Sequence, residues 1–249
     1  MIILFPANAL FLRHKPRQVD QYPDGIKQNM LPTEPRSGDI PDSRPSAEWS
    51  IKRATRSGRF WALIIFPFLA VIGIYIILVH NVKFLVDQGV DKMTAALIFA
   101  MVGVISSVFR VFWGWPSDRI GRELTYTMGI ICACLGVSCL LLFEASGFRQ
   151  LTYTFSILLG IGWAATAPMF MAAAADLFKG KIFGLMYGFV KAGIGIAGAL
   201  GVWVSGFIFD KTRRYNMAFV LVIVVLLLSC AFIWIAAPRK VGLENIQTP

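Results

Sequence analysis

Six long apolar stretches follow one another through the sequence from residue 60 onward. An α-helix rises about 1.5 Å per residue, so about 20 apolar residues cross a hydrocarbon core about 30 Å thick. Each stretch reaches that length, and none shows the strict polar–apolar alternation of a membrane β-barrel strand. The sequence therefore predicts an all-α integral membrane protein with a bundle of six transmembrane helices, at residues 60–79, 93–113, 124–143, 151–173, 184–209 and 217–237.

The composition excludes several classes of function. Hydrophobic residues make up 57% of the chain and charged residues only 15%, whereas a soluble domain has about 25% charged residues. This shortage of charge argues against a soluble enzyme and against a nucleic-acid partner, although the formal net charge is +10. In so apolar a chain, an excess of basic residues is typical of cytoplasmic loops that face anionic membrane lipid.

The sequence before the first span has a different character. Residues 13–59 contain ten of the 24 basic residues and six of the 12 prolines, and they are predicted to form a basic, largely unstructured cytoplasmic linker. Residues 1–12 are apolar but too short to cross a bilayer, and we interpret them as the remnant of a preceding transmembrane helix. The alternatives for these residues are an unusual translation start site and a segment that lies on the membrane surface. Residues 238–249 form the predicted cytoplasmic tail.

The distribution of Lys and Arg predicts how the chain crosses the membrane. With six spans, both ends lie on one side, together with the loops 114–123 and 174–183. That side carries sixteen basic residues and the other side six, so the positive-inside rule places the linker and the tail in the cytoplasm. The basic residues of the last external turn oppose this trend. The predicted location is the cell (inner) membrane.

Two cations lie inside predicted spans, Arg110 in the second and Lys191 in the fifth. A basic residue at the centre of a span costs about 2.5–3.5 kcal/mol on insertion scales, so such residues usually face a cavity and serve a function. Two cations that face one cavity would suit a carboxylate anion, which makes Arg110 and Lys191 the candidate substrate-binding residues. Two alternatives stay open. Arg110 could pair with a loop acid such as Asp118 while Lys191 lines the cavity without touching substrate, or both side chains could snorkel to lipid headgroups.

The fifth span also contains a cluster of small residues, which includes Gly193, Gly195, Gly198 and Gly201. Small residues at these spacings let neighbouring helices approach closely, and they would also allow bending. Close packing is the interpretation we favour. In the fourth span, Pro168 predicts a kink because proline lacks a backbone donor and its ring clashes with the preceding turn.

The sequence lacks the residue patterns that catalysis or metal binding requires. Cys132, Cys134, Cys139 and Cys230 all fall within apolar spans, and their spacing matches no zinc site. There is no phosphate-binding loop and no Ser/His/Asp constellation. We therefore expect no enzymatic activity, no metal and no cofactor, and we expect any transport to be driven by gradients.

Five residues of the loop after the second span resemble the signature loop of the major facilitator superfamily: Gly114, Asp118, Arg119, Gly121 and Arg122. Glu123 stands where that pattern usually has a basic residue. The resemblance implies that these five residues gate the conformational change. The Asp118 carboxylate can accept hydrogen bonds from a helix N-terminus or an arginine, and such a contact can form in one transporter state and break in the other.

The resemblance extends over nearly the whole chain and implies the C-terminal half of a twelve-helix fold. The spacing of Arg110, Gly114 and Asp118, with a second cation at Lys191, resembles the oxalate–formate antiporters and the monocarboxylate transporters. The implied function is gradient-driven alternating access, as antiporter or symporter, for a small organic solute such as a mono- or dicarboxylate. The implied partners are membrane lipid, the solute, and a complementary N-terminal half or a second copy. The alternative is a truncated or non-transporting membrane protein that acts only as a structural or regulatory half.

Overall fold

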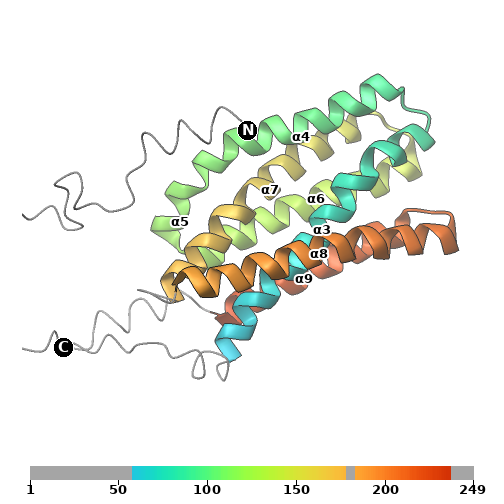
Figure 1. The fold of residues 1–249 in the computed structure, drawn as a ribbon. Helices are drawn as coiled ribbons and strands as arrows, with labels where there is room; N and C mark the ends of the chain where they lie inside the picture. The colour runs from blue at the N-terminus through green and yellow to red at the C-terminus, as the bar shows by residue number, and fades with distance from the viewer. Residues whose placement is uncertain (1–57, 178–182, 237–249) are drawn as a thin grey trace, which may run out of the picture. The chain divides into compact units, whose positions relative to one another are not determined.

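A computed structural model describes residues 58–177 and 183–236 of the chain (Figure 1). These residues form seven α-helices and no strand: α3 (Gly58–Asp87), α4 (Lys92–Phe112), α5 (Gly114–Ile120), α6 (Arg122–Ser146), α7 (Gln150–Leu177), α8 (Phe183–Thr212) and α9 (Asn216–Ala236). All except α5 are long and apolar enough to cross a membrane, which confirms the predicted six-helix fold. The predictions for residues 1–12, for nearly all of the linker and for the tail lie outside the described residues.

The first helix is longer than its hydropathy predicts. The predicted span ends at residue 79, but α3 continues to Asp87. The added turns are amphipathic, because Phe84 and Leu85 are buried while Lys83 and Asp87 face outward and form an ion pair at 2.9 Å. Because these turns mix polar and apolar residues, a search for continuous apolar runs does not detect them.

A short turn with several backbone hydrogen bonds joins α3 to α4. Only residues 88–91 separate the two helices, and Gly89 takes the left-handed conformation that such a turn needs (φ 81°). The buried Val90 donates its N–H to the Leu85 carbonyl at 2.9 Å. The Asp91 carboxylate then caps α4 by accepting from two backbone N–H groups of the first turn, at 3.0 and 3.2 Å. These bonds fix the end of α3 to the start of α4.

Glycines set the closest contacts between helices. The contact of α6 with α7 is the most extensive, and a Cβ atom on Gly162 would lie only 2.5 Å from the Gly129 carbonyl oxygen. In the same way, a Cβ on Gly201 of α8 would lie 2.8 Å from the Ile72 carbonyl oxygen of α3. At Gly195, by contrast, an added Cβ would meet nothing within 4 Å. Close packing therefore explains part, but not all, of the fifth-span glycine cluster.

Aromatic side chains and one polar contact join four helices in the core. Phe66 of α3 meets Tyr126 of α6 and Phe170 of α7 edge to face, with ring centroids 5.4 Å apart in each pair. The hydroxyl of the fully buried Tyr126 is hydrogen-bonded to the Ser229 hydroxyl of α9 at 2.8 Å. Ser229 also donates to the Leu226 carbonyl at 2.7 Å, so both buried hydroxyls have partners.

The helices α4 and α8 flank this core and are the least buried of the six spans. Figure 1 shows α4 along one side of the bundle and α8 along the other. α4 packs mainly on α7, and α8 packs mainly on α3. In each of them 22% of the most apolar window is buried, compared with 44–56% in the other four spans. These two helices therefore offer the largest surfaces for contacts outside the bundle.

Candidate functional site

Arg122, the first residue of α6, connects α5, α6 and α7. Its Nη1 donates to Asp118 Oδ1 and to Ser117 Oγ, both at 2.6 Å. Its Nε donates to Asp176 Oδ2, near the end of α7, at 3.2 Å. The planar guanidinium has donors in two directions, so one arginine can hold two carboxylates at once. This contact ties the motif loop to α7.

Gly121 allows the chain to bring these charges together. Its φ of 105° and ψ of 158° lie in a region that side chains strongly disfavour, and it separates α5 from α6. The turn at Gly121 leaves Asp118 and Arg122 facing each other across four residues. Gly114 differs, because it is the first residue of α5 and an added Cβ there would meet nothing within 4 Å. The structure gives a physical reason for glycine at 121 and none at 114.

Arg119 points into a different environment. Its guanidinium carbon lies 4.3 Å from the centre of the Trp115 ring, a cation–π geometry, and Trp115 is 64% exposed. Within the described part of the chain, Arg119 forms no ion pair. The loop thus brings together three of the five motif residues, Asp118, Gly121 and Arg122, and leaves out Gly114 and Arg119.

Two side chains anchor this region of α4 and α5 on α7. Ser117, which is almost fully buried, accepts from Arg122 and donates to the sulfur of Met169 at 3.3 Å. Trp113, between α4 and α5, donates from Nε1 to the Ile161 carbonyl at 2.8 Å. Part of the predicted loop 114–123 is therefore a short helix, α5, that is bound to α7 by hydrogen bonds.

The sequence-predicted site residues do not include Ser117 or Asp176. Asp176 lies 54 residues from Arg122, so no local spacing pairs the two. The predicted membrane topology could have indicated this pair, because it places the loops 114–123 and 174–183 on the same side of the membrane. An acid in the second loop is then a natural partner for an arginine in the first.

Arg110 lies two residues before the end of α4, and its side chain is exposed. At 3.6 residues per turn, Arg110 shares one edge of the exposed surface with small residues, while bulky residues occupy the other edge. The small residues are Ala96, Gly103 and Ser107, and the bulky ones opposite are Leu97, Val104 and Val108. One bulky side chain, Phe99, which is 37% exposed, also lies on the Arg110 edge. One turn before Arg110, the buried Ser106 hydroxyl has no hydrogen-bond partner among the described residues.

Lys191 has similar neighbours on α8. Its side chain is exposed, and its Nζ lies 5.3 Å from the centre of the Tyr187 ring, one turn earlier. The exposed surface of α8 again has a small-residue edge and a bulky edge. The small residues beside Lys191 are Gly184, Gly188 and Gly195, and the bulky ones opposite are Phe189, Ile196 and Phe207.

The two cations do not contact each other, but they share a kind of surface. Arg110 and Lys191 are carried by different helices on the two sides of the bundle, and neither forms an ion pair within residues 58–177 and 183–236. An unpaired cation is unfavourable against hydrocarbon. The small-residue edges suit a polar space or a closely packed helix, and the bulky edges suit lipid.

The cysteines offer no alternative site. All four are free, and each is partly exposed. No group of three or more His, Cys, Asp or Glu residues able to hold a metal ion occurs in the described ranges.

The sequence model of the Major Facilitator Superfamily matches residues 1–144 and 61–248. Similar curated proteins include monocarboxylate transporter 13 of Rattus norvegicus, 29% identical over 150 residues, which covers 59% of this chain and 34% of the relative. Monocarboxylate transporter 11 of Mus musculus is 28% identical over 184 residues, or 67% of this chain and 38% of the relative. The chain thus spans about a third of the length of these relatives.

Solved structures share the fold. The POT family transporter PepTSo superimposes with a TM-score of 0.64 at 18% identity, over 73% of this chain and 37% of that chain. An auto-inhibited POT family peptide transporter has the same TM-score at 19% identity, over 74% of this chain and 37% of its own. At these identities the likeness concerns the fold alone. The family match, however, covers nearly the whole sequence, and the chain therefore belongs to the Major Facilitator Superfamily.

Proposed function

We propose that this chain is the C-terminal lobe of a gradient-driven carrier that moves a small organic anion, a mono- or dicarboxylate, by alternating access. Superfamily membership and the similarity to monocarboxylate transporters support a role in transport. The observation that carries the anion assignment is the placement of Arg110 and Lys191 on the small-residue edges of the two least buried spans. In carriers of this kind, two lobes enclose the solute near the middle of the membrane.

The two cations lie at different depths in the lobe. By helical rise, Arg110 lies about 3 Å and Lys191 about 12 Å from the helix ends nearest the Arg122 contact. A solute long enough to reach both depths, such as a dicarboxylate, would offset part of both charges. Substrate binding thus gives these polar groups partners that the described residues do not provide.

The same proposal assigns gating to the motif loop. The Asp118 side chain is 72% exposed and that of Asp176 is 33% exposed, so each ion pair with Arg122 contributes only about 0–1 kcal/mol. Contacts of this strength can break and reform in every transport cycle. Gly114, at the junction of α4 and α5, and the exposed Arg119 complete the proposed gate.

A single lobe needs a second surface to complete its site. A complementary N-terminal half, or a second copy, would pack on the small-residue edges of α4 and α8, where helices can approach closely. The count of basic residues supports a cell (inner) membrane orientation with the linker 13–59 and the tail 238–249 in the cytoplasm.

Uptake by proteoliposomes tests the proposal. The full chain is reconstituted alone and together with a complementary six-helix half, and entry of radiolabelled small carboxylates is followed. We expect uptake only with the second lobe, and loss of uptake in Arg110→Ala and in Lys191→Ala. The matched control is Arg149→Ala, which removes an exposed loop cation and should leave uptake unchanged.

Two outcomes contradict the proposal in different ways. Uptake that survives in the double variant of Arg110 and Lys191 overturns the anion site while leaving transport intact. Absence of uptake with any second lobe favours the other interpretation, a structural or regulatory half that does not transport.

A further inference from the structure

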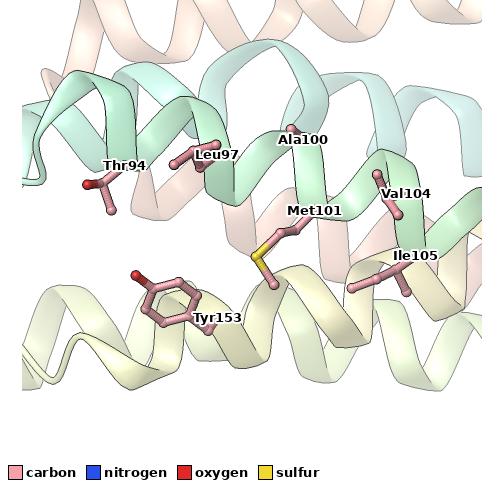
Figure 2. A pocket seen from close by; sticks show the side chains of 7 residues that line it. All are labelled: Thr94, Leu97, Ala100, Met101, Val104, Ile105 and Tyr153. Atoms are coloured by element: carbon pink, nitrogen blue, oxygen red, sulfur yellow. The ribbon is translucent and has the colours of Figure 1, made fainter.

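A groove of about 550 Å³ runs along the bulky edge of α4, where this helix meets α7. Six of its lining residues belong to α4, from Thr94 to Ile105, and the seventh is Tyr153 of α7 (Figure 2). At its far end Ile105 packs closely on Gly160, where an added Cβ would lie 2.8 Å from the Ile105 side chain. The close approach at Gly160 closes the groove there, and toward the start of α4 the two helices leave room between them.

The groove is polar at one end and apolar along the rest of its length. Thr94 and Tyr153 lie in the first turns of α4 and α7, at the end of the bundle remote from the Arg122 contact. Figure 2 shows their hydroxyls at the same end of the groove, and Met101 reaching between the two helices farther along. Hydroxyls and a tyrosine ring at the end of a span are typical of the membrane–water interface. The groove is therefore polar at the membrane–water interface and apolar toward the interior of the bilayer, as one bilayer leaflet is.

The length of the groove also matches a leaflet. From Thr94 to Ile105 the α4 axis rises by about 16 Å. Half of a hydrocarbon core about 30 Å thick is about 15 Å. A chain that enters at the interface would thus reach the closed end of the groove near the bilayer midplane.

The groove opens away from the proposed solute-binding edge. Counted at 3.6 residues per turn, its lining on α4 lies roughly 150° around the helix from Arg110. On α7, the exposed side chains beside it are Tyr153 and Ile157. A second lobe packed on the small-residue edge of α4 would therefore leave the groove open to lipid.

We propose that this groove binds one acyl chain of a bilayer phospholipid, in the leaflet farther from the Arg122 contact, with the ester region of the lipid at Thr94 and Tyr153. The polar end selects an amphiphile over a simple hydrocarbon, and the closed end limits the chain to one leaflet. The binding does not depend on the proposed transport activity, and it holds equally for a lobe that does not transport.

Photolabelling of the full chain tests the assignment. A phosphatidylcholine with a diazirine in its acyl chain is titrated into detergent-solubilised protein, and labelled peptides are mapped by mass spectrometry. We expect saturable labelling within residues 94–105. Ala100→Phe, which fills the groove from an exposed position, should lower the saturable labelling about tenfold, equivalent to about 1.4 kcal/mol of binding free energy. The matched control is Ala231→Phe, at an exposed position on α9.

Tyr153→Ala provides a second variant that empties one wall instead of filling the groove, so an effect of Ala100→Phe on folding cannot imitate the result. It should also weaken the saturable labelling. Labelling of α4 that never saturates, or that matches the labelling of α9, would show ordinary boundary lipid and overturn the proposal. Labelling that falls as protein concentration rises, with crosslinked dimers formed through α4, would assign the groove to a second copy and overturn it too.

Discussion

Arg122 Nε lies 3.2 Å from Asp176 Oδ2, although 54 residues separate the two in sequence. The pair joins the start of α6 to the end of α7, next to the contact of Arg122 with Asp118. One arginine thus connects the motif loop to the helix that carries Pro168, and the arrangement of the loop depends on the position of that helix.

Removing one charge from this pair should change function more than stability. In Asp176→Asn the side chain keeps its size, and we expect the free energy of unfolding to fall by no more than about 1 kcal/mol, because the pair is partly exposed. If the pair gates the two-lobe carrier proposed above, the uptake rate should change severalfold, because loss of the pair changes the balance between conformations. Asp87→Asn, which removes the exposed ion pair with Lys83, is the control and should alter neither quantity. A large loss of stability with unchanged uptake would make the Arg122 pair purely structural.

The two motif glycines should respond differently to alanine. Gly121→Ala forces a side chain into a conformation with φ near 105° and should lower the free energy of unfolding by about 1–3 kcal/mol. Gly114→Ala adds a methyl group in open space at the first residue of α5, and it should raise stability by up to about 1 kcal/mol. Chemical denaturation in detergent measures both variants, and equal effects would refute the argument from backbone conformation.

Alanine substitutions at a second pair of glycines distinguish helix packing within the lobe from packing between two lobes. Gly162→Ala puts a methyl group against the Gly129 carbonyl and should destabilise the lobe by about 1–3 kcal/mol. Gly195→Ala meets no atom within the described lobe, so its effect on stability should stay within about 0.5 kcal/mol. If a second lobe packs against this edge of α8, Gly195→Ala should instead weaken the association of the two lobes, which co-purification measures.

The buried hydrogen bond between Tyr126 and Ser229 should show an asymmetric response. Ser229→Ala leaves the buried Tyr126 hydroxyl without an acceptor, at a cost of about 1–3 kcal/mol. Tyr126→Phe costs only about 0.5–1.5 kcal/mol, because Ser229 keeps its bond to the Leu226 carbonyl. Equilibrium unfolding of both variants and of the double variant gives the coupling energy, and a larger effect of Tyr126→Phe would contradict this account.

The six spans were predictable because each is encoded locally. A run of about twenty apolar residues is sufficient to indicate a membrane helix, whatever its neighbours are. The last two turns of α3 and the short helix α5 were not predictable in this way. In α3 the apolar residues Phe84 and Leu85 lie between the charged Lys83 and Asp87. The short helix α5 is held in place by contacts of Trp113 and Ser117 with α7.

The candidate site was predictable only in part, for a related reason. The residue types and spacing of the motif loop identified Asp118 and Arg122, which are close in sequence and pair at 2.6 Å. The third member, Asp176, is brought in by tertiary structure, as is the partner of Tyr126 at a separation of 103 residues. The shared edge of Arg110 and its small neighbours, in contrast, follows from helical periodicity and was already present in the sequence.

The turn at residues 88–91 fixes one end of the lobe through backbone contacts. The backbone hydrogen bond of Val90 to Leu85 and the side-chain cap of Asp91 join the end of α3 closely to the start of α4. The end of α3 and the start of α4 are therefore held at a fixed distance from each other. At the opposite end of the bundle, the ion pairs of Arg122 with Asp118 and Asp176 join α5, α6 and α7, so side-chain charges hold that end where backbone hydrogen bonds hold the other.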